Sequence, residues 1–145
     1  MPSWVVHGYE EYAKRLPDSF ALQLHEIEAV KRTKSISSQR AKTLESTKLL
    51  GAIPRGSGCI ALDEHGRARS TREWSMQIER WLQSGRDMSI LIGGADGLDQ
   101  SCLDRADSVW SLSPLTFPHA LVRVVVAEQL YRAFSLLNNH PYHRE

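Results

Sequence analysis

Apolar residues recur every three to four positions in five segments of the chain, which is the spacing of one helical face. The segment that starts at Ser70 also carries a capping box, because the Ser70 hydroxyl can accept from the Glu73 amide while the Glu73 carboxylate reaches back. Gly85 is placed to end that helix. The pattern predicts helices over residues 3–16, 38–50, 70–85, 98–106 and 119–137.

Strand-like segments lie between these helices. Phe20, Leu22 and Leu24 alternate with small or polar residues, which is the period of a half-buried strand. Short apolar runs are typical of buried parallel strands, and three occur: Cys59–Leu62, Met88–Ile92 and Trp110–Ser113. Strands that alternate with helices in this way predict an α/β fold with right-handed crossovers and a mainly parallel sheet.

Length and composition set the class of protein. With 145 residues, 41% of them hydrophobic and 24% charged, the chain is expected to form one globular domain over residues 1–145. Its longest apolar runs fall far short of the roughly 20 residues that cross a bilayer, so we expect no membrane partner. Met1–Trp4 shows no basic segment followed by an apolar one, which favours a cytoplasmic location.

The two cysteines, Cys59 and Cys102, lie in apolar runs without a CxxC motif or a nearby histidine cluster. We interpret both as buried thiols, with a functional nucleophile as the alternative. The formal charge of +1 is too small to identify a nucleic-acid binder by its total.

Three loops should meet beyond the carboxyl ends of the parallel strands, where open sheets bind ligands. They are Leu62–Glu64, Gly93–Leu98 and Ser113–Pro118. The glycines of the middle loop can bring backbone close to a ligand, but neither the Lys-Ser/Thr of a phosphate loop nor GxGxxG is present. A ligand poor in phosphate is therefore favoured, and the apolar third loop could wall a purine. The alternative is that the middle and third loops only form turns.

The C-terminal tail gathers two imidazoles, a phenol and a guanidinium in His140, Tyr142, His143 and Arg144. Such a group can stack on a base and hold a phosphate. Metal binding by His140 and His143 is disfavoured, because no third ligand follows at a convincing spacing. We therefore predict no metal.

A basic segment runs from Lys31 to Lys42 without an acidic residue, and contains Lys31, Arg32, Lys34, Arg40 and Lys42. In a nearly neutral chain it suggests one positive edge that meets phosphate. A solvated loop and helix face is the alternative.

Taken together, these segments resemble the ribosomal large-subunit methyltransferase H family of the SPOUT superfamily. The likeness is carried by Leu62-Asp63, Gly85–Asp87, Leu91–Leu98, Ser111–Ser113, Pro118–Ala133 and Asn139–Glu145, and it covers essentially the whole chain. The stretch near the C-terminus is the most specific part.

The resemblance implies a SPOUT fold threaded as a trefoil knot, an exception to the rule against knots. It implies a homodimer that binds S-adenosylmethionine (SAM) and methylates N3 of a pseudouridine in large-subunit ribosomal RNA, on assembled ribosomes. The last helix would form much of the dimer interface, bringing each tail to the partner's cofactor pocket. Matched positions assign SAM to Leu62, Gly93, Leu112, Ser113, Pro114, Leu115, Thr116 and Phe117. The RNA-binding residues that we expect, mainly from the charge pattern and not from matched positions, are Lys31, Arg32, Lys34, Arg40 and Arg123.

Two features depart from the family pattern. The family opens with a further strand ahead of the position of Met1, and its absence would expose a sheet edge. The glycine loop has Ala95-Asp96 where relatives often have Pro-Glu, which keeps an acidic residue.

The chemistry expected is a direct displacement by a base nitrogen on the methyl carbon of SAM, in which positioning dominates. Carbon methylation would need a cysteine adduct, and Cys59 and Cys102 are poorly placed for one. We assign the tail residues His140, Tyr142, His143 and Arg144 to gripping the nucleotide, with a tail histidine as a proton acceptor. The alternatives are a non-catalytic ribosome-binding module and a Rossmann-type nucleotide enzyme.

Overall fold

The computed structural model describes residues 1–143, and the chain divides into two compact units. Residues 25–68 and 86–119 form the first, which contains all three strands and is called the sheet unit below. Residues 1–24, 69–85 and the described part of 120–145 form the second, called the helical unit.

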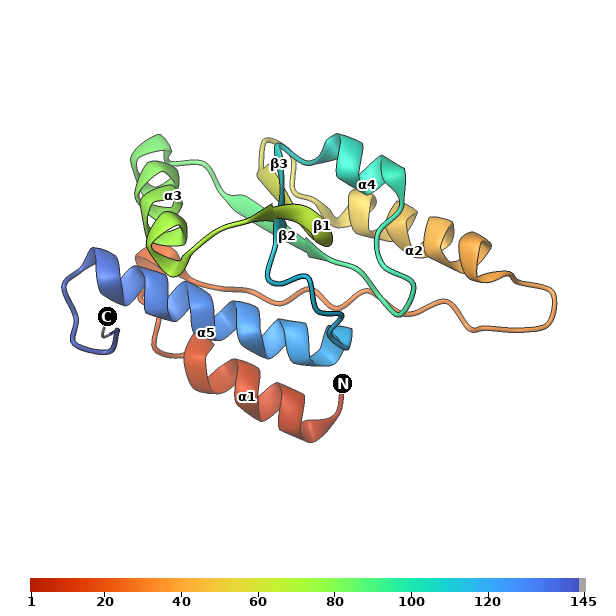
Figure 1. Ribbon diagram of the computed structural model, residues 1–145, viewed down its shortest axis with the longest axis horizontal. Coiled ribbons are helices and arrows are strands. Elements are labelled where there is room, and N and C mark those ends of the chain that lie inside the picture. Colours follow the sequence, from red (N-terminus) through yellow and green to blue (C-terminus); the bar gives the residue numbers. More distant parts are fainter. Residues whose placement is uncertain (144–145) are drawn as a thin grey trace. The chain divides into compact units, whose positions relative to one another are not determined.

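The sheet unit is built on three parallel strands in the order β2-β1-β3 (Figure 1). They are β1 (Gly58–Ala68), β2 (Met88–Ile92) and β3 (Ser108–Ser111). All three predicted buried strands are confirmed as parallel partners, although β3 begins and ends two residues earlier than the apolar pattern indicated. The connection from β2 to β3 passes across β1, and it is a crossover connection of the kind that parallel strands need.

Two helices of the sheet unit, α2 (Ser38–Ala52) and α4 (Gln100–Arg105), lie side by side in Figure 1. Their apolar side chains join the strands in a core whose buried members are Cys59, Ala61, Leu91, Leu98 and Cys102. Burial raises the pKa of both thiols above the ordinary value. The prediction that both cysteines are buried thiols is confirmed.

β1 continues well past the predicted end at Leu62, because it pairs with β3 twice. Leu62 and Arg67 both face Trp110, so four residues loop out of the ladder between them. Gly66 allows the chain to return to the ladder, since a Cβ there would lie 2.8 Å from the carbonyl carbon of Trp110. The predicted loop Leu62–Glu64 is therefore the start of a bulge within the strand.

The helical unit contains α1 (Ser3–Ala13), the short 3-10 turn η1 (Asp18–Phe20), α3 (Thr71–Ser84) and α5 (His119–Leu137). Helix α1 lies beside α5 (Figure 1), where a Cβ at Gly8 would be 3.2 Å from a methyl group of Val124. The capping box of Ser70 and Glu73 is present, and Gly85 ends α3 at a φ of 71°. The predicted helices are confirmed, with α1, α2 and α4 shifted at their ends.

The predicted strand from Phe20 to His25 is wrong. Phe20, Leu22 and Leu24 are half-buried and the residues between them exposed, so the alternation of faces is present. Phe20 stacks on Phe134 with ring centroids 5.2 Å apart. No neighbouring strand pairs with this segment among residues 1–143, and an extended chain becomes a strand only when its backbone groups find such a partner.

The α/β class is confirmed by the parallel sheet and its flanking helices. Threading of the chain into a knot stays a prediction of the resemblance. Within residues 1–143, no helix has the length and apolar character that crossing a membrane requires.

Two glycines provide a matched test of the bulge. Gly66→Ala should lower the free energy of unfolding by about 1–3 kcal/mol, because its Cβ would overlap the β3 backbone. Gly51→Ala, in α2 with nothing within 4 Å of the added methyl, should raise it by about 0.5 kcal/mol. Urea unfolding of both variants measures this, and equal shifts would contradict the described register.

Candidate functional site

One row of residues defines the carboxyl edge of the sheet. Leu62 of β1 is paired with Ile92 of β2 on one side and with Trp110 of β3 on the other. The β1 bulge, the glycine loop and, shortly after Trp110, the 112–117 loop therefore begin along the same edge of the sheet, although β1 itself returns to pair with β3 at Arg67 and Ala68. Leu62, Gly93 and the start of the 112–117 loop lie along this edge, and their binding of a cofactor stays a prediction.

The β1 bulge is tied directly to the 112–117 loop. Thr116 Oγ1 donates to Glu64 Oε2 at 2.8 Å, and Ser111 Oγ donates to the Glu64 carbonyl at 3.1 Å. The loop is also turned locally, because the Leu115 amide donates to Ser113 Oγ at 3.0 Å. Leu115 is left 66% exposed, so an apolar side chain stands at the surface of the edge.

The glycines of the middle loop serve the loop's own geometry. A Cβ at Gly93 would lie 2.5 Å from the carbonyl carbon of Gly97, and Gly97 has a φ of 80°. The Gly97 amide donates to the Gly94 carbonyl at 3.1 Å, which closes a turn. The turn interpretation therefore accounts for Gly93 and Gly97, and the backbone of this turn lies at the edge where a ligand would bind.

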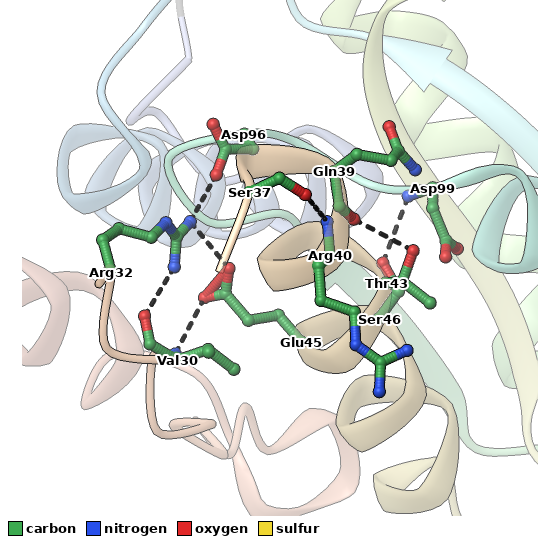
Figure 2. Close-up of polar contacts among 10 residues, drawn as sticks. All are labelled: Val30, Arg32, Ser37, Gln39, Arg40, Thr43, Glu45, Ser46, Asp96 and Asp99. Atoms are coloured by element: carbon green, nitrogen blue, oxygen red, sulfur yellow. Dashed lines mark hydrogen bonds and ion pairs between the residues drawn. The ribbon is translucent and has the colours of Figure 1, made fainter. Parts of the chain in front are cut away.

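Helix α2 and the chain before it hold this loop in place (Figure 2). The Asp99 amide donates to the buried Ser46 hydroxyl at 3.1 Å. Arg32 Nη2 donates to Glu45 Oε1 at 2.9 Å and also contacts Asp96 Oδ2. Glu45, and after it Asp96, raises the pKa of the Arg32 guanidinium above its ordinary value. Arg32 is therefore a fully charged link between α2 and the glycine loop.

The residues at this edge fit the parts of SAM. Half-buried Leu112 and Phe117, with exposed Leu115, offer apolar contacts to a flat purine. The carboxylates of Asp63 and Glu64 at the bulge suit the ammonium group of its amino-acid part. These apolar side chains and carboxylates are chemically compatible with the cofactor that the resemblance implies.

The C-terminal tail belongs to the helical unit and is turned by a Schellman motif. The His140 amide donates to the Ser135 carbonyl at 2.8 Å, and the Asn139 amide to the Leu136 carbonyl at 3.3 Å. Asn139 takes the left-handed conformation, with a φ of 57°, that this motif requires. Pro141 then prevents the helix from resuming.

Tyr142 is fixed against α5 by its ring and by its hydroxyl. The ring lies 4.6 Å from the Tyr131 ring, and the hydroxyl donates to Glu128 Oε1 at 3.1 Å. Arg132 binds the same carboxylate at 2.7 Å and stacks over the Tyr142 ring at 4.8 Å. Burial, and then the charge of Glu128, raises the pKa of Tyr142 to about 12. Tyr142 therefore keeps its proton at neutral pH.

Both tail histidines use Nδ1 as a hydrogen-bond acceptor. His140 Nδ1 accepts from the Tyr142 amide at 3.2 Å. His143 Nδ1 lies 3.4 Å from Arg132 Nη1, and a guanidinium can only donate. In the neutral imidazole this leaves the hydrogen on Nε2. Arg144 lies outside the described residues.

The predicted RNA-binding residues fall in both units. Lys31, Arg32, Lys34 and Arg40 are exposed in the sheet unit, and Arg40 lies in the first turn of α2. Arg123 is half-buried on α5. Arg32 is bound to two carboxylates, those of Glu45 and Asp96.

Sequence reasoning missed four residues that shape the site: Arg15, Glu45, Glu128 and Arg132. Glu128 and Arg132 could have been found, since their spacing of four places them together on a helix. Arg15 stacks over the rings of Tyr12, Tyr131 and Tyr142 at 5.2, 5.4 and 6.0 Å. Within residues 1–143, no three potential metal ligands gather.

The family model described as "Predicted SPOUT methyltransferase" matches residues 1–143. The chain belongs to the SPOUT methyltransferase family. The expected superfamily and enzyme class are thereby confirmed.

Relatives of this SPOUT methyltransferase carry a more specific name, ribosomal RNA large subunit methyltransferase H. The protein of Thioalkalivibrio sulfidiphilus is 55% identical over 145 residues, which is 100% of this chain and 93% of that protein. The Methylococcus capsulatus protein is 54% identical over 144 residues, 99% of this chain and 93% of its own length. The Hydrogenovibrio crunogenus protein is 50% identical over 145 residues, with 100% and 93% covered.

The environment of Tyr142 predicts an alkaline loss of stability. The folded state holds its proton more tightly than the ordinary pKa of 10.0, so the contribution is complete below pH 10 and is lost as the pH rises towards 12. Tyr142→Phe should therefore show a shallower fall of unfolding free energy over this range. A residual fall is expected from Tyr9, whose pKa burial also raises to about 12.

Denaturant titrations of the two proteins at a series of alkaline pH values measure the difference. Glu128→Gln should give an intermediate profile, because burial is the larger cause of the shift and remains. Superimposable profiles for the parent protein and Tyr142→Phe would contradict the assignment.

Proposed function

We propose that this SPOUT methyltransferase transfers the methyl group of SAM to N3 of a pseudouridine in large-subunit ribosomal RNA. The observation that carries the proposal is the single carboxyl edge at which Leu62, Gly93 and the 112–117 loop meet. Relatives at 50–55% identity, named for the large-subunit RNA, support the substrate class. When bound, SAM supplies a methyl group on a positively charged sulfur, which a nitrogen nucleophile can take directly.

The cofactor-binding assignment rests on the loops of the sheet unit. Leu112, Leu115 and Phe117 hold the purine, while Ser113, Pro114 and Thr116 fix the loop around it. Leu62 and Gly93 place the bulge and the glycine turn beside the same pocket. Since Glu64 ties the bulge to Ser111 and Thr116, this side of the pocket is largely preformed, and orientation rather than chemistry by side chains contributes most to the rate.

The tail grips the target nucleotide. Tyr142 keeps its proton, so it acts as a stacking and hydrogen-bonding surface rather than as a base. A proton acceptor would need Nδ1 of His140 or His143, and in both rings that atom already accepts a contact. We therefore revise the proton-acceptor role: each imidazole offers its Nε2 hydrogen to the nucleotide, Arg144 holds a phosphate, and the N3 proton passes to water.

The remaining assignments follow from the substrate. Lys31, Lys34, Arg40 and Arg123 contact RNA phosphates. A homodimer in which the tail of one protomer serves the pocket of its partner would bring nucleotide and cofactor together. The substrate is the assembled ribosome and the location the cytoplasm.

Methyl-labelled SAM and ribosomes that lack the modification provide the direct test. The purified chain should incorporate label into large-subunit RNA, and more from assembled ribosomes than from isolated large subunits. Nuclease digestion followed by mass spectrometry should place the methyl group on a pseudouridine. A folded protein that binds SAM without incorporation would support the non-catalytic ribosome-binding alternative, and binding of adenine nucleotides in preference to SAM would support the Rossmann-type one.

The donor role of the tail predicts a graded series. His143→Ala should lower methyl transfer by roughly a hundredfold because it removes a hydrogen-bond donor, while His143→Gln, which keeps a side-chain N–H, should recover a large part. SAM affinity should remain nearly unchanged in both variants and in Arg144→Ala. His25→Ala, at an exposed histidine in the sheet unit, is the control. If His143→Gln were as inactive as His143→Ala, a base would be the better assignment.

A further inference from the structure

Arg32 stands apart from the other cations of the basic segment, because its side chain is turned onto the protein. Its guanidinium bridges two carboxylates, Glu45 on α2 and Asp96 in the glycine loop (Figure 2). Nη1 donates in addition to the Val30 carbonyl at 2.6 Å. The guanidinium of Arg32 therefore joins its own segment to α2 and to the glycine loop.

The Glu45 end of this bridge is built into the protein. Glu45 is only 8% exposed, and a buried carboxylate needs compensation for its lost hydration. Arg32 Nη2 supplies it at Oε1, while the Val30 amide donates to Oε2 at 3.4 Å. Glu45 thus fixes the position of the guanidinium before any ligand is present.

The Asp96 end of the bridge lies in the glycine turn. Asp96 is the third residue of the turn that the Gly97 amide closes on the Gly94 carbonyl. Gly94 itself passes so close to Glu45 that an added Cβ would be 3.3 Å from Oε2. At the far end of the loop, the Asp99 amide is bonded to Ser46. The loop is therefore attached to α2 at two places. One is the hydrogen bond between Asp99 and Ser46, and the other is the ion-pair bridge through Arg32.

We propose that Arg32 is a positioning residue for the cofactor loop, which its guanidinium holds through Asp96 in the shape that binds SAM. The proposal rests on the proposed function, since it takes the glycine turn as part of the SAM pocket. It moves Arg32 from the phosphate-binding group to the support of the pocket. Arginine suits this place because its planar fork can serve two carboxylates at once, whereas an ammonium is a point charge.

The first readout is SAM affinity in the absence of RNA, measured by titration calorimetry on the full chain. Arg32→Ala should weaken SAM binding by roughly tenfold, and Arg32→Lys by less. Lys34→Ala, at an exposed neighbouring cation, should leave SAM affinity unchanged and weaken only RNA binding. In steady-state assays Arg32→Ala should raise the KM for SAM far more than it lowers kcat.

A second variant guards against general unfolding. Asp96→Ala removes the acceptor at the loop end of the bridge and keeps the buried pair of Arg32 and Glu45. It should weaken SAM binding as Arg32→Ala does, and the double variant should lose no more than either single one. Amide hydrogen exchange of residues 93–99 without SAM should be faster in both single variants, because the turn opens more often.

The experiments distinguish a failure of the proposed function from a failure of the positioning role of Arg32. If the parent protein binds no SAM, the proposed function fails. If the parent protein binds SAM and Arg32→Ala binds it equally well with unchanged exchange of residues 93–99, Arg32 is only an RNA contact and this inference fails. Additive losses in the double variant would also overturn it, since Asp96 would then contact SAM independently of Arg32.

Discussion

The backbone pairing of β1 with a parallel strand on each side fixes where the three loops leave the sheet. Leu62 is the point of reference, because it faces the last residue of β2 and the third residue of β3 in a single row. The register of β1 is fixed once it is paired with a strand on each side, because a shift by one residue would move its buried side chains to the other face of the sheet. The loops can therefore vary in sequence while their starting points stay within reach of one ligand.

The sequence was informative where structure is decided by neighbours along the chain. The capping box at Ser70, the stop at Gly85 and the range of α5 were all read from local spacing, and the structure has them. Phe20–Leu24 shows the limit of that method, because alternation predicts which side chains face inward but not whether a strand lies alongside. The bulge was missed for the same reason: Gly66 is required by the β3 backbone, more than 40 positions away along the chain. The convergence of the three loops was predictable because it follows from strand direction, which alternation with helices had already indicated.

Charge patterns along the chain are a weaker guide than charge in space. The segment from Lys31 to Lys42 contains no acidic residue, and from the sequence all its cations are equivalent. The fold brings in two carboxylates from outside that segment, Glu45 at a separation of 13 residues and Asp96 at a separation of 64. One arginine of the segment is thereby paired with carboxylates, although its side chain remains exposed. Which arginine is paired depends on the buried position of Glu45, and burial of an acidic residue is what hydrophobic patterning predicts least well.

The tail illustrates how a short polar segment can become a defined binding surface. Free side chains at a chain terminus would lose conformational entropy when they closed on a nucleotide, and binding would be weaker by that amount. Here the Schellman turn reverses the chain, and Glu128 and Arg132 fix Tyr142 before any RNA arrives. The same contacts decide the chemistry available to the tail, because they keep Tyr142 protonated and occupy Nδ1 of both imidazoles. A surface arranged in this way can donate hydrogen bonds and stack, so under the proposed function the tail would orient the base rather than remove a proton from it.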